Sequence, residues 1–175
     1  MTAKVQLISP VDGRVYVERE MADATQVEQA LTAAASAQSA WQRRSLSERA
    51  AFCSAAVDAM LSMQADIVPE LAWQMGRPVR YGASELRGFA ERARHMIAIA
   101  PQALAAVEPM PVAGFRRYIK REPLGTVLVV APWNYPYLTA VNTIIPALMA
   151  GNSVCLLYTS PSPRDQRGSR MPSSA

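Results

Sequence analysis

The sequence is poor in several residue types, and each shortage excludes a class of protein. Its 175 residues include two cysteines and one histidine. Two cysteines are too few for a disulfide-stapled secreted domain, so we expect a reducing compartment and a cytoplasmic protein. Charged residues make up 18% of the chain and hydrophobic residues 50%, which excludes a disordered chain, a collagen and a coiled coil.

The sequence predicts neither a signal peptide nor a membrane-spanning segment. Residues 1–6 lack the apolar core of a signal peptide. The most apolar region, 124–157, is interrupted by prolines, asparagines and a glycine, so we predict no membrane span. The formal net charge is only +4, which argues against a nucleic-acid partner. We predict no metal site.

What is present indicates one domain or a piece of a larger protein, beginning with a hairpin and helices. Residues 5–19 alternate loosely around an Asp-Gly turn, which predicts a small β-hairpin. Residues 24–41 are rich in alanine and carry apolar side chains near helical spacing. Residues 82–104 show the pattern of a further amphipathic helix.

Capping signals predict where the intervening helices begin and end. Ser45 and Glu48 form a capping-box pattern, which predicts a helix start. Asp66 predicts a second N-cap, with Pro69 in the first turn of the helix that follows. Gly76 and the proline two residues later predict the end of that helix.

The second half of the sequence predicts a strand–helix–strand unit, so the fold class is α/β. Residues 125–131 form a continuous β-branched run, typical of a central parallel strand covered on both faces. A helix over 138–150 and a strand over 153–156 follow, and a right-handed crossover makes the two strands parallel. Residues 114–122 also favour a strand.

The most informative motif lies where the first of these strands ends. It reads Ala131-Pro132-Trp133-Asn134-Tyr135-Pro136. Open α/β sheets bind ligands at the carboxyl ends of their strands. Asn134 offers an amide donor on a loop held between two prolines, and such rigid placement suits a preorganised oxyanion donor. The alternative is a tight structural turn in which Trp133 fills the core.

Several linked motifs resemble the aldehyde dehydrogenase superfamily. Residues 122–137 and 145–152 are similar to its Pro-Leu-Gly, Pro-Trp-Asn-(Phe/Tyr)-Pro and Pro-Ala-Leu-x-Ala-Gly-Asn motifs at the same spacing. Residues 9–13 and 75–78 more weakly resemble its Asn-Pro-x-Thr-Gly and Thr-Gly-Lys-Pro motifs. The resemblance covers about residues 5–156 and identifies an N-terminal fragment of the family.

The resemblance implies a fold, a reaction and a cofactor. The fold is an N-terminal helical segment plus the first strand–helix–strand of a Rossmann-like parallel sheet, here truncated. The reaction is NAD- or NADP-dependent oxidation of an aldehyde to a carboxylic acid through a cysteine hemithioacetal. Asn134 carries the oxyanion role, and Ala131, Pro132, Trp133 and Asn134 are the implied cofactor-binding residues. The full-length protein would be a homo-oligomer.

The resemblance also divides the chain. It implies a helical part of the cofactor-binding domain at 1–111, an oligomerisation arm strand at 112–123 and an incomplete NAD(P)-binding core at 124–157. Residues 158–175 are rich in serine, proline and arginine, and we expect a disordered, non-native tail.

The sequence departs from the family at its end. Leu157 stands where the family has a lysine. The later glycine motif, the glutamate base and the nucleophilic cysteine in its Gly-Gln-x-Cys context are absent. We therefore expect a fragment with no turnover, low stability and a large exposed apolar surface. The alternative is a non-enzymatic truncated paralogue that pairs with full-length subunits.

Other reactive side chains fit structural roles. Cys53 and Cys155 lie in apolar settings, so we interpret both as buried small hydrophobic residues rather than nucleophiles. His95 is interpreted as a helix-face residue. The basic run at 116–121 is interpreted as a solvated strand, and the resemblance assigns it to the oligomerisation arm rather than to nucleic-acid binding.

Overall fold

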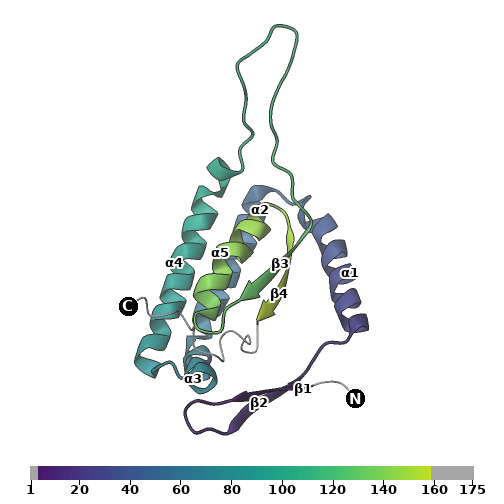
Figure 1. Ribbon diagram of the computed structural model, residues 1–175. Coiled ribbons are helices and arrows are strands. Elements are labelled where there is room, and N and C mark those ends of the chain that lie inside the picture. Colours follow the sequence, from purple (N-terminus) through teal and green to yellow (C-terminus); the bar gives the residue numbers. More distant parts are fainter. Residues whose placement is uncertain (1–3, 159–175) are drawn as a thin grey trace, which may run out of the picture.

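The computed structural model describes residues 4–158, and Figure 1 shows the arrangement of their helices and strands. A β-hairpin comes first, four helices follow, and a strand–helix–strand unit completes the fold. The elements are β1 (Lys4–Ile8), β2 (Val15–Glu20), α1 (Ala24–Trp41), α2 (Leu46–Ser62), α3 (Gln64–Met75), α4 (Val79–Ala103), β3 (Thr126–Ala131), α5 (Pro136–Met149) and β4 (Ser153–Tyr158).

The predicted hairpin is confirmed, and it is anchored to α3. Strands β1 and β2 pair antiparallel. Ser9 is buried, and its hydroxyl donates to the carbonyl of Trp73 at 2.7 Å. The ring of Tyr16 stacks on Trp73 with centroids 5.9 Å apart. Because a two-stranded hairpin alone is marginal in water, these contacts with α3 explain why it is ordered.

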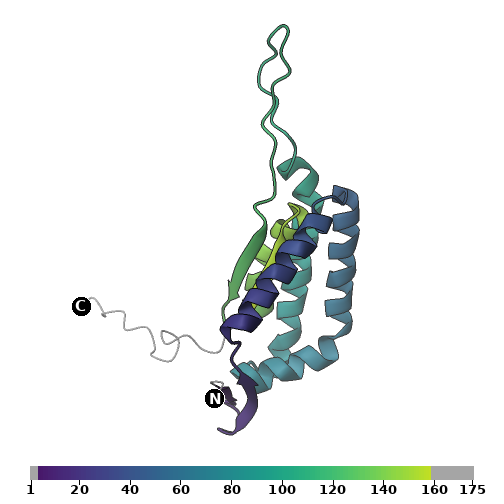
Figure 2. The same ribbon diagram turned by 90° about the vertical axis from the view of Figure 1, so that its right-hand side faces the viewer.

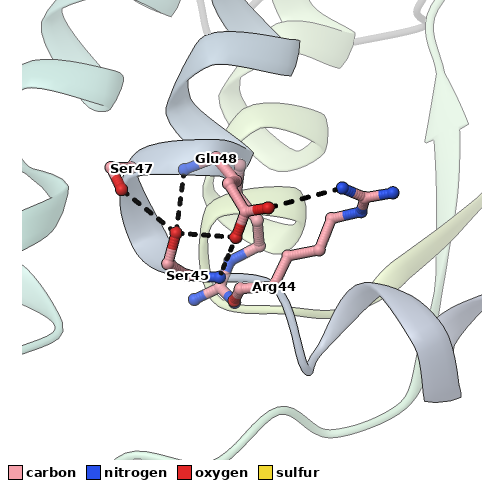
Figure 3. Close-up of polar contacts among 5 residues, drawn as sticks. Arg44, Ser45, Ser47 and Glu48 are labelled. Carbon is pink, nitrogen blue, oxygen red and sulfur yellow. Dashed lines mark hydrogen bonds and ion pairs between the residues drawn. The ribbon is translucent and has the colours of Figure 1, made fainter.

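The predicted capping box at Ser45 is confirmed and starts α2 (Figure 3). The Glu48 amide donates to the Ser45 hydroxyl oxygen at 3.2 Å, and the Ser45 amide donates to the Glu48 carboxylate at 2.8 Å. The Ser45 hydroxyl and amide both stabilise the carboxylate and so lower the pKa of Glu48. A second capping box, Asp23 with Gln26, starts α1 and was not predicted.

The predicted N-cap at Asp66 is wrong. Helix α3 begins at Gln64, because Met63 both ends α2 and precedes α3, leaving no room for a separate cap. Asp66 lies inside the first turn, where a carboxylate still favours the positive end of the helix dipole. Pro69 therefore lies beyond the first turn, where it cannot donate to the carbonyl of Ala65. The predicted stop is confirmed, since Gly76 has a φ of 75°.

The main core lies between α2, α4 and α5. Its buried members come from all three helices and are Cys53, Val57, Ala90, Ala93, Ala100, Val141, Ile145 and Met149. A second cluster joins α3 to α4 through Ile67, Leu71 and Leu86. Helix α4, predicted from Gly82, begins at Val79 directly after Pro78 and packs against both clusters.

Strands β3 and β4 pair in parallel, as predicted. Val129 and Ala131 are buried against α5. The opposite face is open: Leu128 is 64% exposed and Val130 60%. Helix α1 lies beside the sheet, next to β4 (Figure 1), and Leu128 and Val130 stay uncovered. The expectation that β3 is covered on both faces is therefore wrong, while the expected exposed apolar surface is present.

The carboxyl end of α5 is tied to the rest of the fold by polar side chains. The Trp41 indole donates to the carbonyl of Leu148 at 2.9 Å, and the Arg49 guanidinium donates to that of Met149 at 3.1 Å. Asn152 is buried, donates its amide to the carbonyl of Ala147 and accepts from the Gly125 amide at 2.9 Å. Asn152, the asparagine of the Ala-Gly-Asn motif, therefore has a structural role, because it joins the end of α5 to the start of β3.

The strand predicted at 114–122 is not formed by this single chain. The segment between α4 and β3 extends away from the helices as a long double-backed loop (Figures 1 and 2). It holds isolated bridges only, Val107 with Ile119 and Val112 with Phe115. An extended segment with no neighbouring sheet lacks the ladder of hydrogen bonds that defines a strand. The oligomerisation role of 112–123 stays a prediction.

Gly82 in α4 provides a test of the packing between α3 and α4. A Cβ at this position would lie 2.7 Å from Cγ1 of Val68, a stiff β-branched side chain. Gly82→Ala is therefore expected to lower the free energy of unfolding by about 1–3 kcal/mol. At an exposed helix position the same change would instead stabilise the helix by about 1 kcal/mol, because alanine has a higher helix propensity than glycine. Urea unfolding of the parent chain and of the Gly82→Ala variant measures the difference in free energy.

Gly88→Ala is the matched control in the same helix. Its Cβ would meet Cδ1 of Leu138 at 2.9 Å, the far end of a flexible side chain that is able to rotate away. We expect a smaller loss than for Gly82→Ala. A gain in stability from Gly82→Ala would contradict the packing described for this helix pair.

Candidate functional site

The candidate site is the loop between β3 and α5, at the carboxyl end of a parallel strand. Asn134 is exposed there, and its side-chain amide forms no hydrogen bond with any other residue of the described range 4–158. Pro136 is the first residue of α5, a position that suits proline because its N–H would have no partner there. The loop therefore presents one uncommitted amide between a strand end and a helix start.

The other predicted site residues lie beside Asn134 in the same loop. Ala131 is buried and its side chain packs toward α5, so this side chain cannot contact a ligand. Pro132 is partly buried. Trp133 is 43% exposed, which contradicts the alternative in which this ring fills the core. The cofactor-binding role of these residues stays a prediction.

Arg77 fixes the loop, and the sequence reasoning missed it. Its guanidinium donates to the backbone carbonyl of Asn134 at 2.5 Å. The same guanidinium lies over the ring of Tyr135, 4.2 Å from the centroid. The Gly-Arg-Pro sequence was interpreted only as a helix stop and a family motif. Its placement immediately after α3 brings Arg77 to the loop from a distant part of the chain.

Glu85 of α4 binds the other side of the loop. Its carboxylate lies 2.8 Å from the Arg77 guanidinium, and the two side chains are 0% and 9% exposed. The other carboxylate oxygen accepts from the Tyr137 amide at 3.0 Å and the Leu138 amide at 3.4 Å. Helix α5 has no N-cap side chain of its own. Glu85 therefore acts as its cap from another helix, where a negative charge also favours the helix dipole.

A signal for Glu85 exists in the sequence. It occupies the apolar, core-facing side of an amphipathic helix, next to the fully buried Leu86. A carboxylate is almost never buried unless it is paired. A charged residue on the apolar side of a helix therefore predicts a buried partner, although periodicity does not say which one.

Burial and pairing act in opposite directions on Glu85. Burial raises the pKa of Glu85, while the Arg77 guanidinium and the two α5 amides act to lower it. Burial is the larger effect, so the folded state takes up a proton more readily than the unfolded state. Ionisation of Glu85 as the pH rises therefore costs stability. The fold tolerates this buried carboxylate because the Arg77 cation and the two α5 amides both bind it.

The cysteines and the histidine lie away from this loop. Cys53 is buried in the main core, and burial raises the pKa of its thiol. Cys155, in β4, is partly exposed, so the prediction of full burial is wrong for this residue. His95 is exposed on α4, as predicted. Neither cysteine has the electropositive, accessible setting typical of a nucleophilic thiolate.

Thiol labelling tests this assignment. In the native 175-residue chain we expect an aromatic disulfide reagent to modify Cys155 at least about tenfold faster than Cys53, because Cys53 reacts only when the core opens. Cys53→Ala and Cys155→Ser assign each kinetic phase. Rapid native labelling of Cys53 would contradict its placement in the core.

Residues 4–158 contain no group of three or more His, Cys, Asp or Glu side chains placed to hold a metal ion. No single described helix is long and apolar enough to cross a membrane; α2 and α3 pass that test only together, and they are bent by 69°. An open depression of about 600 Å³ runs along α1, and none of its lining residues belongs to the Asn134 loop.

Comparison with known proteins agrees with the fold and the motifs. The sequence model described as the aldehyde dehydrogenase family matches residues 1–164. The chain belongs to the aldehyde dehydrogenase family. This confirms the resemblance inferred from the motifs. The α/β fold class is likewise confirmed.

Individual relatives extend the comparison. The chain is 32% identical over 153 residues to a 3,6-anhydro-alpha-L-galactose dehydrogenase of Streptomyces coelicolor, covering 86% of this chain and 30% of the relative. It is 36% identical over 152 residues to an aldehyde dehydrogenase of Deinococcus radiodurans, covering 85% and 29%. The chain thus spans about 30% of the length of the curated relatives it matches.

Solved structures share the same arrangement. An NADP-dependent glyceraldehyde-3-phosphate dehydrogenase from Bacillus halodurans, complexed with NADP, superimposes with a TM-score of 0.78 at 26% identity, covering 88% of this chain and 33% of that one. PnpE in complex with nicotinamide adenine dinucleotide gives 0.81 at 26% identity, covering 88% and 32%. The α/β arrangement of this aldehyde dehydrogenase chain is therefore that of a larger dehydrogenase fold.

Proposed function

We propose that these residues form the N-terminal part of an NAD(P)-dependent aldehyde dehydrogenase that oxidises a small-molecule aldehyde to a carboxylic acid through a cysteine hemithioacetal. The observation that carries the proposal is the Asn134 amide, uncommitted and exposed at the end of β3 while its own backbone is held by Arg77. A fixed donor of this kind stabilises negative charge that develops on a carbonyl oxygen.

NAD or NADP is the cofactor that we assign to this site. Two structural neighbours were solved with NADP or NAD bound. The residues present fit such a group, because Trp133 and Asn134 are exposed at the carboxyl edge of a parallel strand. Ala131, Pro132, Trp133 and Asn134 would line it. When bound, the nicotinamide accepts a hydride.

The chain's own contribution to the reaction is positional and electrostatic. Asn134 donates its side-chain N–H to the substrate oxygen as charge builds on it. Arg77 holds the backbone of Asn134, so this donor needs no reorganisation when the charge appears. The nucleophilic cysteine and the general-base glutamate would come from residues outside these 175, since neither Cys53 nor Cys155 has the setting of a nucleophilic thiolate. We propose a cytoplasmic location and, for the full-length protein, a homo-oligomer.

The test uses the complete product of the gene that encodes these residues. We expect it to reduce NAD or NADP in the presence of an aldehyde, followed by the absorbance of the reduced nicotinamide, over a panel of aliphatic, aromatic and sugar-derived aldehydes. The 175-residue chain is the control and is expected to show no turnover. Absence of aldehyde-dependent reduction by the complete product with either cofactor would contradict the proposal.

A second candidate function has its own observation. In the loop before β3, Met110, Phe115 and Ile119 are 84%, 73% and 62% exposed. Exposed apolar side chains on an extended, unpaired segment favour pairing with another chain. The chain would then be a non-enzymatic paralogue that pairs with full-length dehydrogenase subunits. Co-purification of a tagged 175-residue chain with a full-length dehydrogenase, lost on Phe115→Asp and Ile119→Asp, would favour this function.

A further inference from the structure

A buried ion pair links three segments that meet at the Asn134 loop. Arg77 follows α3, Glu85 lies in α4, and the loop precedes α5. Glu85 Oε2 accepts no well-directed hydrogen bond within the described part of the chain, so its 2.8 Å contact with Arg77 is ionic. A pair this deeply buried contributes little net stability by itself. Stability therefore does not explain why the Arg77–Glu85 pair lies at this loop.

We propose that Arg77 and Glu85 are positioning residues that set the conformation of the loop and thereby aim the Asn134 amide. The inference rests on the proposed function for its catalytic meaning. Each member of the pair holds one side of the loop. Arg77 binds the carbonyl of Asn134, and Glu85 binds the amides of Tyr137 and Leu138.

The geometry leaves Asn134 little freedom except at its side chain. Its backbone carbonyl is occupied by Arg77, and the ring of the next residue, Tyr135, lies against the same guanidinium. Three residues after Asn134, the chain is held again by Glu85 at Tyr137. Two fixed points this close together restrict the backbone between them, and the side-chain amide remains as the free donor.

The chemistry of the pair explains why these residue types are used. A guanidinium carries several donors in a planar fork, so one amino group meets Glu85 while the other meets Asn134. An ammonium group is a single compact charge and does not reproduce both contacts together with the stacking on Tyr135. Arg77→Lys therefore removes the link between the ion pair and the loop while it keeps the charge.

The first measurement is residue-level hydrogen exchange on the complete gene product. First-turn amides of a helix have no partner in their own helix and exchange quickly. Here the Tyr137 and Leu138 amides are expected to be protected, because Glu85 accepts from both. Glu85→Gln is expected to speed their exchange roughly tenfold while deeper α5 amides are unchanged, since a neutral acceptor binds amides more weakly.

The second measurement separates positioning from stability. Arg77→Lys is expected to lower kcat about 10–100-fold with little change in KM, since a small misplacement of a catalytic group has effects of this size. Arg94→Gln is the control, because it removes an exposed ion pair with Asp58 from α4, the helix that carries Glu85. We expect it to leave both exchange and kinetics unchanged.

The two tests distinguish this inference from the proposed function. If the complete product oxidises no aldehyde but the exchange of Tyr137 and Leu138 follows Glu85, the proposed function fails and the positioning of the loop stands. If these two amides exchange as fast in the parent protein as in Glu85→Gln, the positioning inference is overturned whatever the activity. A parallel loss of exchange protection throughout α5 would also overturn it, because that result indicates a general structural role.

Discussion

Asn134→Ala is expected to lower kcat of the complete gene product about 10²–10³-fold, the usual cost of removing one oxyanion donor. The reason is local: the side-chain amide of Asn134 is uncommitted among the described residues, while its backbone is already bound by Arg77. Alanine keeps the backbone and removes only the donor. We therefore expect KM to change much less than kcat.

The matched control is another exposed asparagine a few residues along the chain. Asn142 in α5 accepts from Arg92 and donates to the Leu138 carbonyl, each at 3.2 Å, and neither partner belongs to residues 132–135. Asn142→Ala is expected to leave the kinetic constants within about twofold, as for a typical surface substitution. Equal losses in the two variants, or a loss for Asn134→Ala confined to KM, would show that Asn134 is not the oxyanion donor.

Glu85→Ala is expected to lower the free energy of unfolding by about 3–5 kcal/mol, because it leaves the Arg77 charge buried without a partner. The same change removes the cap from α5, since the Tyr137 and Leu138 amides lose their acceptor. Glu85→Gln keeps an acceptor of the same shape and is expected to cost less. Urea unfolding of the 175-residue chain, followed by circular dichroism, measures both losses.

Asp58→Ala is the control for this stability prediction. Asp58 and Arg94 are 2.8 Å apart, but their side chains are 68% and 57% exposed. An exposed pair of this kind contributes about 0–1 kcal/mol. If the parent chain is only marginally stable, Glu85→Ala will abolish its cooperative transition whereas Asp58→Ala will retain it. Similar midpoints for the two variants would contradict the burial of the Arg77–Glu85 pair.

Local signals in the sequence predicted much of the fold. The hairpin, the Ser45 capping box, the stop at Gly76 and the β3–α5–β4 crossover were all predicted, and all are present. Each depends on residues a few positions apart or on a general rule of chain handedness. The same local reasoning failed at Asp66, because a cap residue is only a preference and the tight α2–α3 junction took precedence.

The failures in the sheet region have a different cause. The 114–122 segment has strand propensity, yet a strand also needs a neighbour, and this single chain offers isolated bridges only. Strand β3 has the composition of a fully covered strand, yet Leu128 and Val130 are exposed. Composition records what a segment is suited to pack against, not whether that partner belongs to the same 175 residues.

The sequence by itself determined the family and the candidate donor. The Pro-Trp-Asn-Tyr-Pro motif and its spacing from the Ala-Gly-Asn motif are local patterns, and they were sufficient to select Asn134 at the end of a parallel strand. Only the tertiary structure decided how that residue is held. Glu85 and Tyr137 are 52 positions apart, and Arg77 and Asn134 are 57 apart. Periodicity describes contacts within a turn or a strand pair, whereas contacts over such separations arise when α4 and α5 pack together.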